Sequence, residues 1–480
     1  MPEGFPARIY SEAVLAHNFE HARRHFLDAL IQIHHAHTRM LAKCGIITGQ
    51  ECAALLRALG GMDRERIEAA EFDGSFEDLF YLLESQLDEL AGPHLAGKLH
   101  TARSRNDIAI TLYRMTARRA VLAISEALAD AQRIVLDAAA GHIDTVMPAH
   151  THGQPAQPTT LAHYLLAASE FLARDSDRLR SAYGRVNLCP MGAAAITTSG
   201  FPIDREETAR LLGFDGLAEN SYGAIAAIDY ITECAAAVAV AMVNLGKLIQ
   251  DLLLWSTREF GFLRLADGFV QASSIMPQKR NPVALEHVRI LSSRALGQAQ
   301  AVLTCAHNTP FGDINDSEDN LQPLVAAMFG DAQRALNLFS GLMGAAEFDR
   351  ERMACRAAKD FLTVTELADT LVRRAGMSFR EAHDAVAEAV RMCGSDDSAA
   401  AMLQALRRVR PDSPLTAEEI AQALDPRYFV KVRAATGGPA PERVKESLER
   451  ARAGLIEMQN WVVRKTAALD AARSKLLQAA

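Results

Sequence analysis

The sequence predicts an all-α protein, and three observations carry this prediction. Only 6% of the 480 residues are aromatic and only 2 are Trp, while Ala, Leu, Arg and Glu are abundant, a balance that favours helices over sheets. The 49% hydrophobic and 23% charged residues are typical of a globular chain with a large core. Residues 107–142, 158–183 and 224–260 show helical periodicity over unusual lengths. A prior of about 150 residues per domain gives about three domains.

The N-terminal part of the chain is predicted to be helical. Residues 19–44 show a helical pattern that ends at Gly45, whose backbone freedom suits a helix C-terminus, and Thr48 is suited to cap the next helix. Residues 71–90 repeat leucine at helical spacing and stop before Gly92. We assign residues 1–102 to an N-terminal helical domain.

The three long helices are expected to form a bundle in a central domain, residues 103–354. A helix of 36 residues over 107–142 would be about 54 Å long at ~1.5 Å per residue, and it needs partners along that length. The Ala-rich window 235–241 permits close helix approach, as at the centre of an oligomeric bundle. The apolar run 234–245 is shorter than a membrane span of about 20 residues and is interpreted as part of a buried helix.

A smaller helical C-terminal domain is predicted over residues 355–480. Beyond Phe348 the charge density rises and the helices are expected to shorten, because prolines punctuate the chain. Neither an internal repeat nor a low-complexity tract interrupts this organisation.

Charge and cysteine content exclude several classes of function. With 51 Lys and Arg against 59 Asp and Glu the net charge is −8, which argues against a nucleic-acid-binding protein. The 7 cysteines are scattered, without a CxxC or Cys/His spacing, so neither disulfides nor structural zinc are expected. The first six residues show no secretory leader pattern, and we expect a cytoplasmic protein.

Three polar loops between the helices carry the candidate chemistry. The first, residues 100–107, places Ser104, Arg105 and Asn106 ahead of a long helix. An arginine fork beside a helix N-terminus suits a carboxylate or phosphate clamp. A capping loop whose arginines pair with surface acids explains the same residues, and from this loop alone it is the simpler interpretation.

The second loop, residues 147–157, sets His150 and His152 on either side of Thr151. No cysteine or acid nearby completes a metal set, so a metal site is disfavoured. A single histidine that acts as acid or base near neutral pH is the more economical chemistry. A hydrogen-bonded structural histidine is an equal alternative.

The third loop, residues 272–282, combines Ser273 and Ser274 with Lys279 and Asn281. A serine hydroxyl becomes a base only when positive charge and backbone N–H groups stabilise its ionised form, and Lys279 can supply that charge. The GxSxG elbow of the α/β-hydrolases is absent. A flexible polar turn is the alternative interpretation.

These loops resemble a known family. The stretch Ser273-Ser274-Ile275-Met276-Pro277-Gln278-Lys279-Arg280-Asn281-Pro282 closely resembles the signature of the fumarase/aspartase superfamily. Within it the chain is most similar to the argininosuccinate lyases, with which it shares the stretches Gly97–Asp107, Thr151–Pro158, Arg185–Asn187, Phe201–Arg205, Asn220–Ser221 and Asp251–Gly261. The resemblance is dense from about residue 70 to about residue 300 and looser at both ends.

The resemblance implies a cofactor-free, reversible β-elimination that breaks a C–N bond of an N-substituted aspartate and releases fumarate. Ser273 is then the base that removes the proton beside a carboxylate, while Lys279 and Asn281 stabilise the aci-carboxylate that forms. His152 assists the departing nitrogen or orients the substrate. Glu286 stands where the family's histidine finds its carboxylate partner, a contact that raises an imidazole pKa.

The resemblance also implies the remaining contacts and the assembly. Thr151 acts with the catalytic residues on the succinyl half of the substrate. The implied substrate-binding residues are Ser104, Arg105, Asn106, Gln157, Ser274, Met276 and Asn281. The implied architecture is a three-domain, nearly all-α homotetramer whose central helices form a 20-helix bundle, with each active site built from three subunits. Isolated subunits are then expected to be inactive.

The chain departs from the family pattern where the leaving group binds. An ungapped alignment from the signature puts Asp313, Glu318 and Leu321 at the positions of a Tyr, a Gln and a Lys that grip the amino-acid end of the arginine half. Phe80 replaces a family histidine, and Leu30–His34 replace Asp-Ile-x-Gly-Ser. If they face the pocket, the acids of segment 307–319 favour a cationic or amine leaving group, whereas a solvated acidic loop is the equal alternative.

Two classes of function remain. The preferred one is a C–N lyase of the argininosuccinate lyase branch, with argininosuccinate as the default substrate and another N-substituted aspartate or aminocarboxylic acid as the runner-up. The other is a catalytically silent structural homologue. The retained candidate residues of all three loops argue against the second class.

Overall fold

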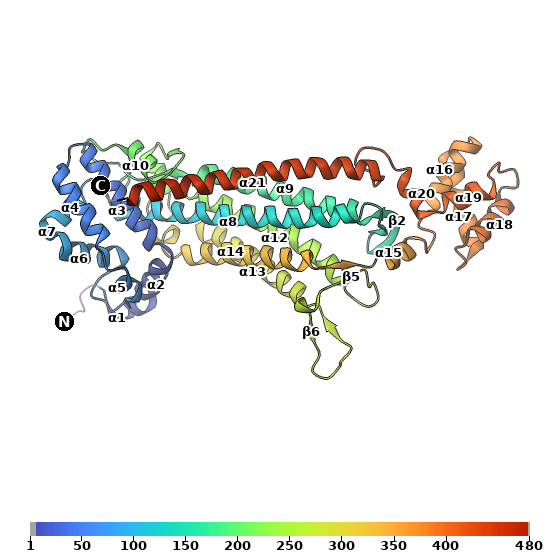
Figure 1. Ribbon diagram of the computed structural model, residues 1–480, viewed down its shortest axis with the longest axis horizontal. Coiled ribbons are helices and arrows are strands. Elements are labelled where there is room, and N and C mark those ends of the chain that lie inside the picture. The colour runs from blue at the N-terminus through green and yellow to red at the C-terminus, as the bar shows by residue number, and fades with distance from the viewer. Residues whose placement is uncertain (1–5, 479–480) are drawn as a thin grey trace.

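The computed structural model describes residues 6–478, and its helical architecture confirms the all-α class. Met1–Phe5, part of the segment without a leader pattern, lie outside these residues. Figure 1 shows an elongated molecule in which a bundle of long helices lies between N-terminal helices at one end and short C-terminal helices at the other. Within the described residues, strands form four two-stranded sheets.

The elements follow one another in a simple order. The helices are α1 Arg8–Tyr10, η1 Ser11–Leu15, α2 Ala16–His25, α3 Leu27–Lys43, α4 Gly49–Gly60, α5 Arg64–Ala69, α6 Leu79–Ala91, α7 Pro93–Lys98, α8 Arg105–Gly141, α9 Leu161–Val186, α10 Arg205–Leu211, α11 Ser221–Ala226, α12 Asp229–Trp255, η2 Asp267–Phe269, α13 Val283–Ala306, η3 Asn315–Ser317, α14 Gln322–Gly344, α15 Arg350–Ala357, α16 Val364–Ala375, α17 Phe379–Cys393, α18 Ala399–Val409, α19 Ala417–Ala423, α20 Pro426–Lys431 and α21 Pro441–Leu477. The strands are β1 Val146–Thr151, β2 Gln154–Thr160, β3 Leu188–Cys189, β4 Gly216–Leu217, β5 Leu263–Arg264, β6 Gln271–Ala272, β7 Arg280–Asn281 and β8 Glu347–Phe348.

Five long helices, α8, α9, α12, α13 and α14, pack along one another as the central bundle. Their buried side chains belong to one continuous hydrophobic core, which stabilises helices of this length. The predicted helices 107–142 and 158–183 correspond to α8 and α9. The predicted helix 224–260 is wrong in two respects: the extended Ala227 separates α11 from α12, and α12 ends at Trp255.

Helix α12 is long and apolar enough, by length and composition, to cross a membrane. In the structure it packs against α9, α13 and α14, and Cys234, Ala235 and Leu245 are buried there. The interpretation of run 234–245 as part of a buried helix is therefore confirmed for the face that packs on the bundle. Its other face leaves Val240 and Val243 exposed by 38% and 46%, and an open apolar face of this kind is typical of a subunit interface.

The N-terminal helices join the main core through α2, α3 and α6, and they also form a smaller core of their own. Thr48 caps α4 through a capping box with Glu51, as its position predicted. The predicted helix over 19–44 is kinked at Phe26, which separates α2 from α3 while the backbone hydrogen bonds of the two helices continue through it. Helix α6 begins at Leu79, after Asp78 caps its first turn.

The C-terminal part contains two kinds of helix. Helices α16 to α19 are short and share a small core of their own. The prediction that the C-terminal helices are short is wrong for α21, which has 37 residues. This helix runs back along α8 and α9 to the N-terminal end, as its red ribbon in Figure 1 shows. Leu448, Leu455, Val462, Leu469 and Leu476 are buried along it, and this spacing of seven suits packing along another long helix.

Candidate active site

The first loop leads into α8, and Ser104–Asn106, which are the N-cap and the first two residues of that helix, are called the binding turn. Ser104 caps the helix: its Oγ accepts the Asn106 N–H at 3.4 Å, and its own N–H donates to Asp107 Oδ1 at 2.9 Å. The capping role considered from the sequence is therefore real. The binding turn also presents polar side chains to a cavity, because Arg105 and Asn106 line a cavity of about 320 Å³.

The side chains of the binding turn have acidic partners. Arg105 Nη1 donates to Asp78 Oδ2 at 2.9 Å and lies 3.1 Å from Glu77 Oε1. Asn106 donates through its side-chain amide to Asp313. The guanidinium of Arg105 also lies 5.0 Å from the centre of the Tyr81 ring. These contacts fix the orientation of the Arg105 guanidinium.

Acidic residues that follow α13 form one wall of this cavity. Asp313, Glu318 and Asp319 line it together with Arg105 and Asn106, which places these acids of segment 307–319 at the cavity. Burial, the contact with Asp313 and the charge of Asp319 raise the pKa of Glu318 well above its usual range. The buried phenol of Tyr113 donates to Asp319 Oδ1 at 2.6 Å. Among the lining residues within 6–478, Arg105 is the only Lys or Arg, so the cavity has more acidic than basic side chains.

Asp107 fixes the binding turn to the segment Cys189–Asp204. The carboxylate is fully buried, and its Oδ2 accepts the N–H groups of Gly192 at 2.8 Å and Ala194 at 3.0 Å. Burial raises the pKa of Asp107, and the three N–H donors oppose that shift. Its structural role was missed in the sequence, although a serine followed three residues later by an acid is a capping-box pattern.

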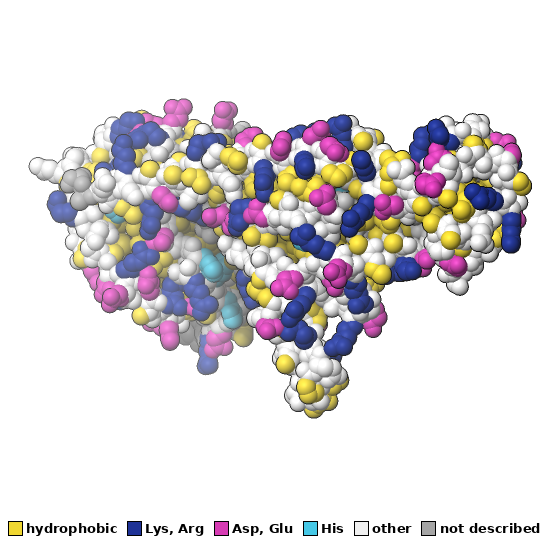
Figure 2. Space-filling model, turned by 45° about the vertical axis from the view of Figure 1, so that its right-hand side comes forward, with side chains coloured by type: hydrophobic (Ala, Val, Ile, Leu, Met, Phe, Trp, Pro, Cys, Tyr) yellow, Lys and Arg dark blue, Asp and Glu magenta, His cyan; other side chains and the backbone are white. Residues whose placement is uncertain are grey.

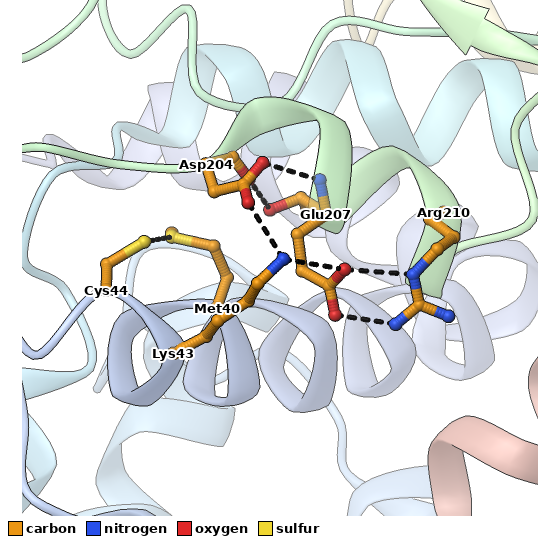
Figure 3. Close-up of polar contacts among 7 residues, drawn as sticks. Met40, Lys43, Cys44, Asp204, Glu207 and Arg210 are labelled. Atoms are coloured by element: carbon orange, nitrogen blue, oxygen red, sulfur yellow. Dashed lines mark hydrogen bonds and ion pairs between the residues drawn. The ribbon is translucent and has the colours of Figure 1, made fainter.

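An ion-pair cluster anchors the far end of that segment to the N-terminal helices, as Figure 3 shows. Lys43 Nζ on α3 lies 2.9 Å from Asp204 Oδ2 and 3.2 Å from Glu207 Oε2. Arg210 Nη2 lies 2.6 Å from Glu207 Oε1. The segment is therefore held at both ends, by Asp107 near its start and by Lys43 at its end.

The second loop is a β-hairpin rather than an irregular loop, since β1 pairs with β2 from Val146 to Thr160. Thr151 pairs with Gln154, and His152 and Gly153 form the two-residue tip, both with positive φ, 51° and 74°. Positive φ at both central positions is the mark of a type I′ hairpin turn. The tip projects Thr151 and His152 into solvent.

The base of this hairpin contacts the C-terminal helices. Gln157, on β2, donates its side-chain amide to Thr365 Oγ1 at 3.1 Å, and α15 and α20 pack against the two strands. Gln157 is therefore placed at a contact between the hairpin and α16. In this chain it lies away from the binding turn, at the other end of α8.

The third loop is the tip of a second hairpin, β6–β7, in which Ala272 pairs with Arg280. Ser273 Oγ accepts the Met276 N–H at 3.0 Å and the Ile275 N–H at 3.4 Å. The hairpin stands out from the bundle in Figures 1 and 2, and Ile275 at its tip is 83% exposed. Ser274, Met276 and Lys279 are exposed on the same tip, with Asn281 at its base and Glu286 exposed in the first turn of α13.

The structure does not bring the three loops together within one chain. The binding turn and the Thr151–His152 tip lie at opposite ends of α8 (Figure 1), and its 37 residues span about 55 Å at ~1.5 Å each. The Ser273 hairpin projects from the bundle between them. Over residues 6–478, no group of three or more His, Cys, Asp or Glu side chains is placed to hold a metal ion.

The chain matches proteins of known name over nearly its whole length. Residues 9–297 match the family described as Lyase, and residues 361–431 match the family described as Argininosuccinate lyase C-terminal. Argininosuccinate lyase 2 of Agrobacterium fabrum is 42% identical over 466 residues, which cover 95% of this chain and 92% of that protein. The argininosuccinate lyase of Methanoculleus marisnigri is 41% identical over 455 residues, 94% of this chain and 91% of that protein.

Solved structures agree with this relationship. The EDDS lyase crystallised in complex with formate is 35% identical and superposes with a TM-score of 0.87 over 99% of this chain and 96% of that one. A fumarate lyase from Mesorhizobium sp. BNC1, 21% identical with a TM-score of 0.74 over 94% of this chain and 99% of that one, shares the fold. The chain therefore belongs to the argininosuccinate lyase family of the fumarase/aspartase superfamily and is a carbon–nitrogen lyase.

Proposed function

We propose that this enzyme catalyses the reversible β-elimination of fumarate from an N-substituted aspartate. Ser273 takes the proton from the carbon beside one carboxylate, the electron pair forms the C=C bond, and the C–N bond breaks so that the nitrogen leaves with a proton. Lys279 and Asn281 stabilise the aci-carboxylate as charge develops on it. His152, with Glu286 as its carboxylate partner, orients the substrate or serves the departing nitrogen.

The observation that carries this proposal is the local geometry of Ser273. Its hydroxyl oxygen already accepts the Met276 N–H at 3.0 Å, and N–H donors aimed at an oxygen favour its ionised form. Lys279 lies on the same hairpin tip and adds positive charge. A serine that is to act as a base needs both kinds of stabilisation.

We assign the active form to a homotetramer in which each site takes loops from three subunits. The wide separation of the loops in one chain supports this assignment, because residues at the two ends of α8 can meet only between chains. The open apolar face of α12 and the exposed Ile275 offer surfaces for other subunits to cover. Five bundle helices in each of four chains would give the 20-helix bundle.

We take argininosuccinate as the first substrate to test, with arginine and fumarate as products and arginine biosynthesis as the pathway. The names of the relatives that are 41% and 42% identical support this choice. In this assignment, Ser104, Arg105 and Asn106 bind the succinyl half with Thr151. Ser274, Met276 and Gln157 complete the pocket from the other loops. The seven free cysteines suit a reducing cytoplasm.

A second candidate is the same elimination on a different N-substituted aspartate or aminocarboxylic acid. The acidic wall favours it, since Asp313 and Glu318 line the cavity where the family pattern has a Tyr and a Gln. The carboxylate of Asp313 attracts an amine or another cation and repels a free carboxylate, while the raised pKa of Glu318 keeps that group largely protonated near neutral pH. The 35% identity to a protein named EDDS lyase, over 99% of this chain, is consistent with this candidate.

Ultraviolet absorbance of fumarate's conjugated diacid separates these candidates. Purified enzyme is offered argininosuccinate and, separately, a panel of N-substituted aspartates with amine-bearing or carboxylate-bearing leaving groups. Turnover of argininosuccinate supports the first candidate. Turnover of an amine-bearing compound alone supports the second. No fumarate from any compound contradicts the proposed reaction and favours a structural homologue without activity.

A further inference from the structure

A buried chain of hydrogen bonds lies directly behind the binding turn. Arg103, the residue before the turn, is 6% exposed. Its Nη1 lies 2.8 Å from Nδ1 of His34 on α3, and its Nη2 donates to Oε1 of Glu84 on α6 at 3.2 Å. One guanidinium therefore ties the binding turn to two helices of the N-terminal part.

A second contact from α3 holds the peptide just before Arg103. His37 Nε2 lies 2.9 Å from the carbonyl oxygen of Thr101 and donates to it. Ala102 between them has a φ of 62°, in the left-handed region that residues other than glycine rarely adopt. A strained residue persists only where its surroundings fix it, and here His37 and Arg103 do so on either side.

The hydrogen bond between Arg103 and His34 defines the state of the imidazole. A guanidinium only donates, so Nδ1 of His34 has to accept and the ring is the neutral tautomer with its proton on Nε2. Burial, and then the charge of Arg103, lower the pKa of His34 well below its ordinary value. The other titratable neighbours are His35, His37 and His100, which oppose a charge on the ring, with Glu84 beyond the guanidinium.

We propose that His34 is a positioning residue for the elimination: its neutral imidazole holds Arg103, and Arg103 holds Ser104–Asn106 in the orientation that binds the succinyl half. This inference rests on the proposed function, which gives the binding turn its role. His34 stands where the family pattern has a serine, and Phe80, whose ring centre lies 5.9 Å from that of His34, stands where it has a histidine. In this chain the imidazole behind the turn thus comes from α3 and not from α6.

Removing Nδ1 of His34 takes away one of the two hydrogen-bond partners of the Arg103 guanidinium. Nε of Arg103 already lacks a hydrogen-bond partner within the described part of the chain. Without Nδ1 of His34, the guanidinium keeps Glu84 as its partner and gains a further unpaired donor in a buried site, which is costly. Arg103 is then expected to turn toward Glu84 and to pull the backbone before Ser104 with it. The base Ser273 lies on a different hairpin and is not moved.

Fumarate is the probe for the test, because it is the half of the substrate that every candidate reaction shares. We expect His34→Leu to weaken fumarate binding at least about tenfold in calorimetry, the lower end of what a lost hydrogen bond to a charged group costs. His34→Asn places an amide oxygen near the position of Nδ1 and is expected to bind fumarate within about twofold of the wild type. The matched control is His35→Leu, since His35 is also buried on α3, 7% exposed against 1% for His34, but its Nδ1 has no hydrogen-bond partner among the described residues.

Asn106→Ala separates this inference from the proposed function. If Asn106→Ala and His34→Leu both weaken fumarate binding while His34→Asn and His35→Leu do not, the inference stands. If Asn106→Ala alone weakens it, the positioning role of His34 is wrong and the proposed site survives. If Asn106→Ala has no effect, the binding role of the turn is wrong and the inference falls with it.

If the His34→Leu variant does not fold, a second pair of variants, His34→Gln and His34→Asn, tests the proposal. His34→Gln keeps a polar side chain but moves the acceptor by one bond, so it is expected to bind fumarate more weakly than His34→Asn at the same native mass. Equal binding by the Asn and Gln variants would overturn the proposal, because the position of the acceptor would then not matter.

Discussion

Replacing Asp107 by alanine tests how the binding turn is held in place. The fully buried carboxylate accepts three backbone N–H groups, from Ser104, Gly192 and Ala194, at 2.8 to 3.0 Å. A hydrogen bond to a charged group contributes about 1.5–3 kcal/mol. Since water can satisfy part of what is lost, we expect Asp107→Ala to destabilise the native state by about 3–5 kcal/mol. Asp107→Asn keeps one acceptor oxygen, and we expect it to cost about half as much.

Hydrogen exchange read by mass spectrometry locates this effect. The amides of Gly192 and Ala194 are expected to exchange faster in Asp107→Ala, while peptides from α16 to α19, which have a separate core, keep their wild-type rates. Chemical denaturation gives the size of the loss. Unchanged exchange in the peptide that contains Gly192, or a loss below about 1 kcal/mol, would refute the tethering role of Asp107.

Three further predictions follow from the assembly and from the buried histidines. Mixed oligomers of Ser273→Ala and His152→Asn chains are expected to regain activity at about a quarter of their sites if these residues come from different subunits; persistent inactivity of the mixture contradicts shared sites. Val243→Asp, on the open face of α12, is expected to lower the native mass measured by light scattering, whereas Val463→Asp, at an exposed position of α21, is expected to leave it unchanged. Burial lowers the pKa of His35 to about 4 and that of His37 to about 3 from an ordinary 6.5. Between each lowered pKa and 6.5, the unfolded chain therefore binds more protons than the native chain. The stability they contribute is complete above pH about 6.5 and is lost as the pH falls toward about 3; a denaturation midpoint that does not fall with pH in this window would be inconsistent with neutral buried histidines.

The long helices could be predicted because their signal is local. Segments 107–142 and 158–183 carry the apolar period of a helix over many turns, and they correspond to α8 and α9 with shifts of a few residues. The split between α11 and α12 was missed because Ala227 interrupts the helix without a glycine or proline to mark it. The return of α21 was missed although its heptad spacing is visible in the sequence.

The hairpins and the cavity depend on contacts that a local pattern does not encode. Residues 154–157 were predicted as loop and residues 158–160 as the start of a helix, and only their pairing with β1 makes β2 a strand. The division at residues 102 and 354 stays a prediction, although α21 packs on α8 and α9 rather than on the short C-terminal helices. Whether Asp313 and Glu318 face the pocket could not be decided from the sequence, since it depends on how segment 307–319 folds back on α8.

The central claim is that Ser273 removes a proton from an N-substituted aspartate so that fumarate forms. The most direct test compares fumarate release by the wild type, Ser273→Ala and Ser274→Ala from the best substrate of the panel, by ultraviolet absorbance at equal native mass. We expect Ser273→Ala to lose at least about a hundredfold in kcat, the usual share of a general base, and Ser274→Ala to keep measurable turnover. Wild-type rates in Ser273→Ala would contradict the mechanism.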